Sequence, residues 1–474
     1  MRLIWKTLLG IAILTTLFAL PPSRVSISPL PCHSPHALSQ TAEINRNFWA
    51  KNFDTEAHYE IESTLLASGE YCLIYMQDTL IQQIGVGVAQ SNCESYMDEF
   101  DTLIYPTVVE LTGNPNGTLG DIDGDPRIVI LINDNYVSYY SQYNEIESTY
   151  SNHCEMIYIY YFNSLILDTI AHEFCHLIWF NYEFDEVHFI LEGLAEYATY
   201  KCGYLEADNN VSCRTNDFLQ NPNDPLIYFD VAAKDYGASY LFTFYLAERF
   251  GTQFLGDLVQ YEEDGAHGIE SALLQDGYNI SFNQLYLDWI TALTINQLGF
   301  ADDKYGFNNL DVRIQDVSVV DVIPLEIEDM EVWCYGSNIF EVTDPLNGFE
   351  VEMAAPSSGK IGLSIVYHDS GGWHVSQRIS NGPISHNVSG ISLDSAYVIV
   401  TYFFASTPSG GIDFGVGISE DIDFSIAPYN PSTETGITTE NDHSTDLLLL
   451  VITGGGILAA SVVILFGIRK HINR

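Results

Sequence analysis

The chain has 474 residues, enough for two to four domains with substantial cores. It carries 63 acidic and 17 basic side chains, which give a formal net charge of −46. Such an acidic surface repels phosphate groups, so nucleic-acid binding and attachment to anionic lipid through a basic face are excluded. At 47% hydrophobic and 13% aromatic residues, the chain is too apolar to be disordered.

The N-terminus has the composition of a secretory signal. Arg2 and Lys6 precede an apolar run from Leu8 to Leu20, and Pro21 follows that run. A positive segment, a short apolar segment and a helix-breaking boundary are typical of a signal peptide, which we expect over residues 1–28. No pair of small residues precedes Pro21 in the usual cleavage pattern, so cleavage and retention as an anchor both stay open.

The C-terminus contains an uncharged segment, residues 447–468, that would form a helix about 33 Å long. It is followed by a short basic segment with Arg469, Lys470 and Arg474. Positive charge is retained on the cytoplasmic side, so the pattern predicts a transmembrane helix over 447–468 and a cytoplasmic tail over 469–474. The sequence therefore predicts a single-pass cell-surface protein with an extracellular N-terminal portion and the lipid bilayer as a partner of its C-terminal helix.

The chain between these ends divides into two regions by texture. Short apolar runs at 71–76, 127–133 and 156–162 predict strands, and helical periodicity appears at 96–111, 165–180, 187–201, 237–250 and 282–297. Strands precede helices, so we expect an α+β domain over 29–309. Further strands are predicted at 360–368, 395–404 and 411–419, which indicate an all-β sandwich over 310–425. Residues 426–446 are rich in Pro, Ser and Thr and predict a flexible stalk.

Eight cysteines in an exported chain predict disulfide bonds. We expect Cys202 to pair with Cys213 and Cys72 with Cys93, while the pairing of the other four cysteines stays open. Four N-x-S/T sequons are typical of a glycoprotein, although they also arise by chance; they begin at Asn116, Asn210, Asn279 and Asn387.

The segment most informative about chemistry is the H-E-x-x-H motif formed by His172, Glu173 and His176. Histidines four residues apart lie on the same face of a helix, so both imidazoles can reach one metal ion. Glu173 is then beside that ion and can act on its water. The alternative is a helix with two histidines at this spacing by chance.

A catalytic zinc site needs a third protein ligand and an open position for water. Glu192 lies sixteen positions after His176 on another apolar helix, where a carboxylate is costly unless it is paired or bound to a metal. Glu196, one turn later, can orient a ligand histidine through its outer N–H, and Asp168 is a rival for that role. For both of these acids, an ordinary solvated helix face is the alternative.

Asp121, Asp123 and Asp125 alternate around Gly124 in a pattern that suits Ca²⁺, a cation that prefers oxygen ligands. The pattern is similar to the first half of an EF-hand loop, but Ile132 occupies the position of the bidentate glutamate. A bare acidic turn is the alternative to a calcium site.

The segments HEFCH and LEGLAEY together resemble the gluzincin metallopeptidases, in which a glutamate from a downstream helix completes the H-E-x-x-H site. The chain is most similar to the secreted peptidases of the hyicolysin and immune inhibitor A kind. The shared elements are AHEFxH, a D-x-D-G-D segment before a strand (121–125) and a YGAxYLF segment (236–242). The resemblance covers roughly residues 45–300 and implies a zincin-like catalytic domain; nothing comparable extends over the sandwich.

Three features depart from the family pattern. Cys175 stands where relatives often have Gln, which places a soft ligand or a disulfide partner near the metal. Leu191 replaces the usual Asn before the ligand glutamate. The spacing from histidine to glutamate is shorter than in aminopeptidase N-like enzymes, which argues against an aminopeptidase. A metzincin is also disfavoured, because His188 lies at the wrong distance to be a third histidine ligand.

The resemblance implies metal-assisted hydrolysis with Zn²⁺ as cofactor, His172, His176 and Glu192 as ligands and Glu173 as general base. It also makes Tyr236 and Tyr240 candidates for stabilising the oxyanion. In a chain with 30 tyrosines, a role in the hydrophobic core is the alternative for both.

The function predicted from the sequence is a membrane-anchored extracellular zinc metalloendopeptidase, a hydrolase acting on protein or peptide substrates. The alternative is a cell-surface adhesion or recognition protein that binds through the sandwich and contains an inactive zincin domain. A purely structural surface-layer protein fits the charge and the stalk but leaves the H-E-x-x-H motif unexplained.

Overall fold

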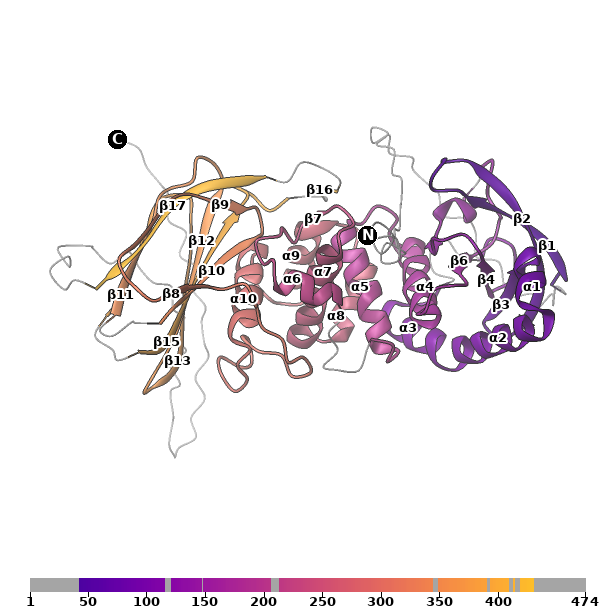
Figure 1. Ribbon diagram of the computed structural model, residues 1–474, viewed down its shortest axis with the longest axis horizontal. Helices are drawn as coiled ribbons and strands as arrows, with labels where there is room; N and C mark the ends of the chain where they lie inside the picture. The colour runs from indigo at the N-terminus through magenta and orange to yellow at the C-terminus, as the bar shows by residue number, and fades with distance from the viewer. Residues whose placement is uncertain are drawn as a thin grey trace, which may run out of the picture. The chain divides into compact units, whose positions relative to one another are not determined.

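The computed structural model describes residues 42–115, 121–146, 148–205, 213–343, 348–389, 393–408, 412–413 and 418–429. All of them belong to one compact unit, whose helices and strands are labelled in Figure 1. The predicted signal peptide (1–28), membrane helix (447–468) and tail (469–474) lie outside the described residues, as does the stalk beyond residue 429.

The first sheet has six strands in the order β1-β2-β3-β4-β6-β5. Strands β3, β4 and β6 are parallel, and the remaining neighbours are antiparallel. The strands predicted at 71–76, 127–133 and 156–162 are confirmed with small shifts at their ends. The bounds are β1 (Asn45–Lys51), β2 (His58–Ser68), β3 (Cys72–Gln77), β4 (Ile128–Asn133), β5 (Tyr139–Tyr140) and β6 (Met156–Tyr160).

Both faces of this sheet are buried. Side chains alternate along each strand, so that Ile74 and Ile130 join the larger core cluster while Leu73 and Val129 join a smaller one on the opposite face. The connection from β3 to β4 is helical, with α1 (Asp78–Ile84), α2 (Val86–Glu99), a π-helical turn η1 (Phe100–Ile104) and α3 (Tyr105–Thr112). The helix predicted at 96–111 is therefore confirmed, although a π-helical turn interrupts it.

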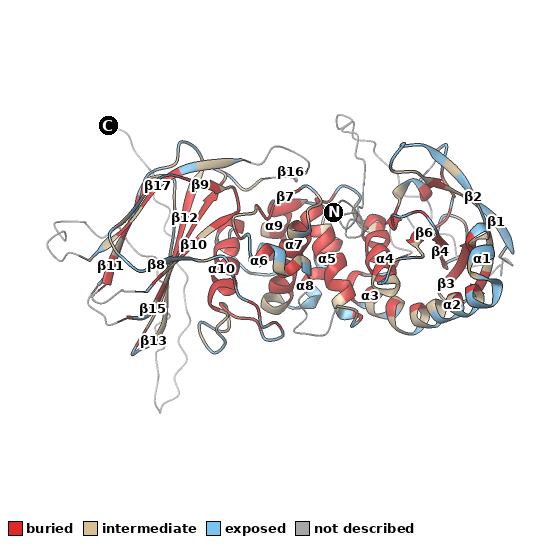
Figure 2. Cartoon of the chain, in the orientation of Figure 1, coloured by how far each residue is buried: buried red, intermediate tan, exposed pale blue. Residues whose placement is uncertain are grey.

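The middle of the chain is helical. The helices predicted at 165–180, 187–201, 237–250 and 282–297 correspond to α4, α5, α7 and α10. The bounds are α4 (Ile166–Tyr182), α5 (His188–Lys201), α6 (Cys213–Leu219), α7 (Ala233–Phe250), α8 (Thr252–Val259), α9 (Gly265–Gln275) and α10 (Phe282–Ile295). Figure 2 shows α4, α5 and α7 mostly in the colour of buried residues. This burial explains the apolar sequences of α4 and α5, which contain the HEFCH and LEGLAEY segments.

Two glycines permit close packing around α7. A Cβ atom at Gly193 of α5 would lie 2.6 Å from the carbonyl oxygen of Ser239, and one at Gly237 of α7 would collide with the carbonyl oxygen of Arg214. Real Cβ atoms do not approach backbone oxygens this closely, because the atoms would overlap. Helices α5 and α6 can therefore lie against α7 only with glycine at these two positions, and Gly193 immediately follows Glu192.

The C-terminal part of the described chain forms a five-stranded sheet, β13-β12-β15-β10-β8, and a four-stranded sheet, β14-β11-β17-β9. The rings of Phe340 and Phe424 stack across the two sheets with centroids 4.7 Å apart. Helix α10 packs on the five-stranded sheet, where the Thr291 and Ser364 hydroxyls are 2.9 Å apart. The bounds are β8 (Ser318–Val320), β9 (Leu325–Trp333), β10 (Ser337–Val342), β11 (Gly348–Met353), β12 (Lys360–Asp369), β13 (Gly372–Ser380), β14 (Ile384–Ser389), β15 (Leu393–Phe403) and β17 (Ser419–Pro428).

Of the three strands predicted in this region, 360–368 and 395–404 are confirmed as β12 and β15. The strand predicted at 411–419 is described only as the two-residue β16 (Ile412–Asp413), which pairs with β7 (Tyr228–Phe229). Strand β17 runs on to Pro428, past the predicted end of the sandwich at residue 425. The predicted boundary near residue 310 stays a prediction, because one hydrophobic core cluster includes residues from both sides of it.

The predicted fold class, an α+β zincin-like domain with an all-β sandwich and a C-terminal transmembrane helix, needs correction. The structure is a mixed α/β arrangement in which helices cross between parallel strands. Among the described residues, no helix is both long enough and apolar enough to span a bilayer. Helix α7, with 18 residues, carries charged side chains near both of its ends: Lys234, Asp235, Glu248 and Arg249. The predictions of a single-pass membrane protein and of the bilayer as a partner are therefore not supported.

The predicted disulfides are not present in the described part of the chain, where all seven cysteines are unbonded. Cys72 and Cys93 are buried in the hydrophobic core, and burial raises the pKa of both thiols, so the protonated thiol is favoured there. Cys202 is buried while Cys213 is exposed. Two of the four sequon asparagines, Asn279 and Asn387, are exposed, and glycosylation stays a prediction.

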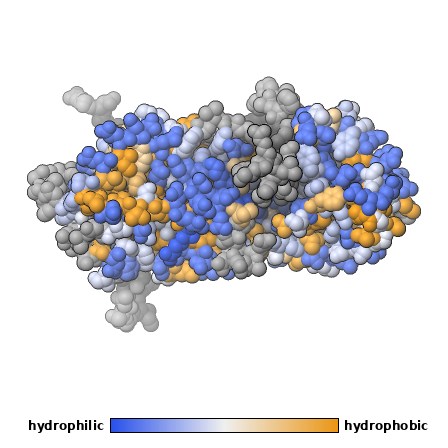
Figure 3. All heavy atoms as spheres, viewed as in Figure 1, coloured by the Kyte–Doolittle hydropathy of each residue, from blue (hydrophilic) through white to orange (hydrophobic). Residues whose placement is uncertain are grey.

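The surface is compatible with the acidic composition. On the face seen in Figure 3, hydrophilic residues are mixed with separate groups of hydrophobic ones. Separate groups of this kind are ordinary on protein surfaces.

The role of Gly193 can be tested by adding one methyl group. We expect Gly193→Ala to lower the free energy of unfolding by about 1–3 kcal/mol, because the new Cβ forces α5 away from α7. Gly87→Ala is the matched control, since a Cβ there meets no atom within 4 Å and the exposed first turn of α2 should gain up to about 1 kcal/mol. Denaturant unfolding measures both, and equal behaviour of the two variants would contradict the packing argument.

Candidate metal centre

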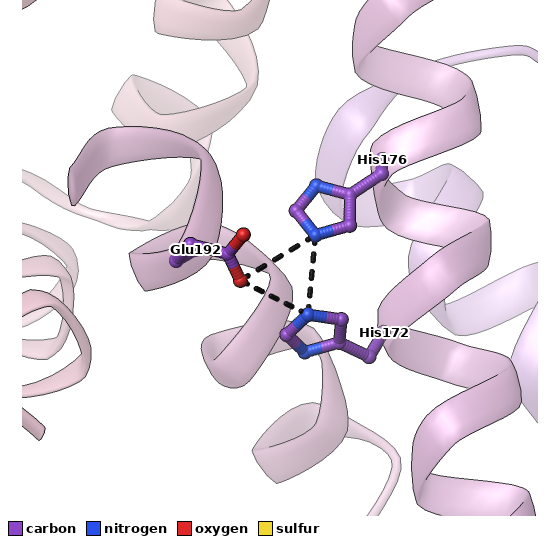
Figure 4. A group of neighbouring side chains, drawn as sticks. All are labelled: His172, His176 and Glu192. Atoms are coloured by element: carbon purple, nitrogen blue, oxygen red, sulfur yellow. Dashed lines mark hydrogen bonds and ion pairs between the residues drawn. The ribbon is translucent and has the colours of Figure 1, made fainter. Parts of the chain in front are cut away.

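The sequence of helix α4 gives it one face that packs in the hydrophobic core and another that presents two histidines. Ile170, Phe174 and Leu177 are buried in the hydrophobic core, and the Phe174 ring packs against Phe100 at 5.0 Å. The start of the helix is fixed by the Thr169 hydroxyl, which donates to the carbonyl of Leu165. The remaining face is left for His172 and His176, which are one turn apart and point towards α5 (Figure 4).

The two histidines converge with Glu192 of α5 on one point. The Nε2 atoms of His172 and His176 are 3.1 Å apart, and a Glu192 Oε2 atom lies 3.1 Å from the first and 3.6 Å from the second. All three residues are buried, and Figure 4 shows their side chains turned towards one another from the two helices. His172, His176 and Glu192 therefore form a buried group that can hold a metal ion.

The electrostatics of this group favour a positive charge at its centre. Burial alone would lower the pKa of His172, but the hydrogen bond and the charge of Glu192 outweigh it and raise that pKa to about 9. Burial alone would raise the pKa of Glu192, yet the charges and hydrogen bonds of His176 and His172 hold it well below its ordinary value. The buried carboxylate of Glu192 is thus stabilised by positive charge placed between the three side chains.

Glu173 lies beside the group and is completely buried. Its Oε2 accepts a hydrogen bond of 2.8 Å from the backbone N–H of Tyr140 on the edge strand β5, while its Oε1 has no hydrogen-bond partner among the described residues. Burial raises the pKa of Glu173, although the charges of His172 and His176 oppose that rise. The main chain therefore fixes one oxygen and leaves the other available for a proton.

Glu196 and Asp168 differ in how closely they approach the ligands. An oxygen of Glu196 lies 3.7 Å from His172 Nδ1, and the same oxygen pairs with the guanidinium of Arg214 on α6. No hydrogen bond links Asp168 to His172 in the described structure; burial and then the charge of Glu196 raise the pKa of Asp168 to about 7. Glu196 is therefore better placed than Asp168 to orient His172.

The two candidate tyrosines of α7 occupy different surroundings. The hydroxyl of Tyr236 is buried without a hydrogen-bond partner among the described residues, and the Arg214 guanidinium lies 4.4 Å from its ring centroid. Burial and then the charge of Glu192 raise the pKa of Tyr236. Tyr240 instead packs on Phe244 at 5.7 Å, within an aromatic cluster. The hydroxyl of Tyr236 thus lies within range of the charge of Glu192, whereas the ring contacts of Tyr240 lie in the core.

A cavity of about 560 Å³ opens beside the metal-ligand group, with His176 and Glu192 in its wall. Its lining is rich in aromatic residues and includes a few charged side chains, among them Lys51, Glu183 and Glu186. The aromatic members are Trp49, Phe53, Tyr139, Tyr140, Tyr143, Tyr150, Tyr158, Phe180 and Phe184. A cavity of this size that combines an apolar wall with a few polar groups is typical of a binding site.

Cys175 is not part of the ligand group. It is completely buried in the core, and burial followed by the charge of Cys202 raises the pKa of its thiol. Burial thus favours the protonated thiol, and Cys175 is not among the residues that converge to hold a metal ion, although it adjoins His176 in sequence.

The acidic loop before β4 differs from the sequence prediction. Asp121 and Asp123 gather with Glu155, the residue before β6, and not with Asp125. Asp125 is used elsewhere, because its carboxylate pairs with the guanidinium of Arg127, whose Nε donates to Asp125 Oδ1 at 2.8 Å. A second acidic group, Glu183, Asp185 and Asp264, lies near the end of α4 and is partly exposed.

Comparisons with known proteins identify no relative. No protein-family model matches the chain, and no curated protein matches it. Among solved structures, a mitogen derived from Yersinia pseudotuberculosis is 9% identical, with a TM-score of 0.16, and covers 25% of this chain and 98% of its own. PliG from Aeromonas hydrophila, a periplasmic lysozyme inhibitor of g-type lysozyme, is 9% identical, with a TM-score of 0.17 and coverages of 23% and 96%. Similarities this weak carry no functional argument.

Sequence reasoning missed several residues that the structure brings to the site. Arg214 neutralises Glu196 from a helix eighteen positions away, and the scarcity of basic residues was the only signal that could have singled it out. Tyr140 acts through its backbone N–H, which no side-chain pattern reveals. Glu155 is brought to the acidic loop by the pairing of β4 with β6.

The buried carboxyl of Glu145, which is hydrogen-bonded to Tyr140, should make the stability of the protein depend on pH. The Tyr140 hydroxyl donates to Glu145 Oε1 at 3.0 Å; burial and then the charge of Glu155 raise the pKa of Glu145 from 4.5 to about 8, against the effect of that hydrogen bond. Because the folded-state pKa is raised, protonated Glu145 contributes stability that is complete below pH 4.5 and is lost as the pH rises through 8.

We therefore expect Glu145→Gln, which keeps an acceptor for Tyr140 and has no charge, to stabilise the protein at pH 8 by at most about 4 kcal/mol and to have little effect at pH 4.5. Denaturant unfolding at the two pH values measures the difference. Glu110→Gln, an exposed change on α3, should show no such dependence. A Glu145→Gln effect that is the same at both pH values would contradict the assignment.

Proposed function

We propose that the protein is a zinc-dependent hydrolase of peptide bonds. The observation that carries the proposal is the convergence of His172, His176 and Glu192 next to the buried carboxyl of Glu173. Two imidazoles and one carboxylate with a neighbouring general base are the parts that metal-assisted hydrolysis requires. The family resemblance of the HEFCH and LEGLAEY segments supports the same conclusion from the sequence.

The ligand spacing supports zinc as the metal. A tetrahedral zinc ion with bonds of 2.0–2.1 Å holds its ligand atoms about 3.3 Å apart. The three separations in this group are 3.1, 3.1 and 3.6 Å, close to that value. With three protein ligands, a fourth position remains for water or substrate. When bound, zinc supplies the Lewis acidity that acidifies water and polarises a scissile carbonyl.

Glu173 is the proposed general base. Its free Oε1 takes the proton from the attacking water as the new C–O bond forms, and returns it to the amine nitrogen as the C–N bond breaks. The Tyr140 N–H holds the other oxygen, so the carboxyl keeps its orientation during both transfers. Burial raises the pKa of Glu173, which makes it a better proton acceptor than a solvated glutamate.

Tyr236 is the proposed donor to the oxyanion. Its unpaired buried hydroxyl, near the charges of Glu192 and Glu173, is a costly feature unless a ligand uses it. The positive charge of the Arg214 guanidinium against the ring makes the Tyr236 hydroxyl a stronger hydrogen-bond donor to a negatively charged oxygen. The aromatic cavity wall favours peptides with a bulky apolar side chain beside the scissile bond.

The alternative from the sequence, a recognition protein with an inactive zincin domain, gains no specific support. His172, His176 and Glu192 converge as a metal site would require, and Glu173 has a buried oxygen without a hydrogen-bond partner among the described residues; both observations support the hydrolase. The experiments below separate an active enzyme from a protein that only binds metal.

Replacing Glu173 separates metal binding from chemistry. We expect Glu173→Gln to retain about one equivalent of zinc and to lose roughly 10²- to 10⁴-fold in peptide cleavage, because only the proton acceptor is removed. Glu192→Gln should lose the metal as well as the activity, since the carboxylate is a ligand. Elemental analysis and cleavage of casein or a mixed peptide library, with 1,10-phenanthroline as inhibitor, measure the two effects. Glu110→Gln is the inert control. Full activity in Glu173→Gln would overturn the mechanism.

Arg214 is a positioning residue, because it acts on His172 through Glu196. Removing its charge with Arg214→Gln leaves a buried Glu196 unpaired, and we expect zinc affinity to fall about 10- to 100-fold. Arg214→Lys should recover part of that affinity, which a purely packing role would not explain. Competition with a chelator measures the affinity without reference to activity. Equal zinc affinity in the wild type and Arg214→Gln would show that Glu196 needs no such partner.

A further inference from the structure

We propose a second metal site, in which Asp121, Asp123 and Glu155 bind a divalent cation of the calcium class where strands β4 and β6 begin. Each residue offers one carboxylate oxygen, and these oxygens lie within 4.8 Å of one another. The site is separate from the His172, His176 and Glu192 group and does not depend on the proposed peptidase activity. Oxygen ligands alone favour Ca²⁺ over zinc.

Glu155 supplies the observation that distinguishes this group from an ordinary acidic turn. Its side chain is 1% exposed, and its Oε1 accepts a hydrogen bond of 2.8 Å from the backbone N–H of Ile122. Its Oε2 is buried with no hydrogen-bond partner among the described residues. A buried carboxylate oxygen without a partner is costly, and a bound cation offsets that cost directly.

The loop is organised to present oxygens. The backbone N–H of Gly124 donates to Asp121 Oδ1 at 2.6 Å, and that of Asp125 donates to Asp123 Oδ1 at 2.8 Å. Each aspartate therefore has one oxygen that orients the side chain and a second that remains for a ligand. Gly124 adopts a φ of 85°, which allows the tight turn that brings the two carboxylates together.

Neighbouring positive charge offsets this group only in part. Arg127 is already paired with Asp125. Burial raises the pKa of Asp123, and the charge of Arg46, whose Nη2 donates to the backbone carbonyl of Asn152 at 2.7 Å, opposes that rise without cancelling it. Three carboxylates that repel one another therefore lie in one place, one of them fully buried. A divalent ion would link the loop before β4 to the residue before β6, two neighbouring strands of the parallel part of the sheet.

The test is a calcium titration of the full chain, freed of divalent ions and kept at a fixed free zinc concentration, with thermal unfolding as the readout. We expect CaCl₂ to raise the Tm with a Kd of about 10⁻⁴ M. Asp121→Asn keeps the acceptor for Gly124 and should weaken calcium binding at least about tenfold. Glu155→Gln should abolish the calcium-dependent shift. Asp134→Asn, an exposed acid just after β4, is the matched control and should respond as the wild type does.

The outcomes are distinguishable. A Tm increase in the wild type and in Asp134→Asn that is lost or weakened in Asp121→Asn and Glu155→Gln supports the site. If all four proteins respond equally, calcium binds elsewhere on the acidic surface and the proposal is wrong. No response in the wild type also overturns it. Should Glu155→Gln fail to fold, Asp121→Asn alone decides, because that change leaves the buried residue intact.

Discussion

The packing of α4 against α5 is the constraint on which the candidate centre depends. His172 and His176 are fixed to one face of α4 by helix geometry alone, but Glu192 reaches them only because α5 lies close alongside. Gly193, the next residue, lets α5 approach α7 so closely that a single methyl group would collide with its backbone. Backbone packing therefore brings the side chains of the three residues within reach of one another.

Charge balance is the second constraint, since the surroundings of the centre are rich in buried acids. Glu192 and Glu196 are both buried on α5, and each has its own cationic counterpart: the histidines for the first and Arg214 for the second. Glu173 has a hydrogen-bond partner for only one of its two carboxylate oxygens, and the other oxygen is buried without one among the described residues. In an acidic chain, a buried carboxylate oxygen without a partner is informative, because its burial is costly unless a proton or a ligand offsets that cost. Glu155 fits the same reasoning at the loop before β4.

Sequence reasoning predicted the features that depend on neighbouring residues and failed for those that depend on contacts between distant parts of the chain. The H-E-x-x-H spacing and the strands at β3, β4 and β6 are local patterns, and the structure has them where they were predicted. The parallel crossover between β3 and β4 depends on strand pairing across some fifty residues of chain, which no local period encodes, so the arrangement was misjudged as strands followed by helices. Asp125 was assigned as a calcium ligand because of its spacing, whereas Arg127, two residues later, takes its carboxylate. The predicted membrane helix rested on a hydropathy pattern outside the described residues, and no described helix supports it.

The most direct test of the metal centre is X-ray absorption spectroscopy at the zinc edge on the full chain, loaded with one equivalent of zinc. Two imidazole nitrogens and a carboxylate oxygen should give a first shell of nitrogen and oxygen atoms at about 2.0–2.1 Å, with the outer-shell pattern of two histidines. Glu192→Gln should no longer give this first-shell signal, because the third ligand is lost. A sulfur shell at about 2.3 Å, which would place zinc on Cys175 or another thiol, would contradict the assignment of His172, His176 and Glu192 as the centre.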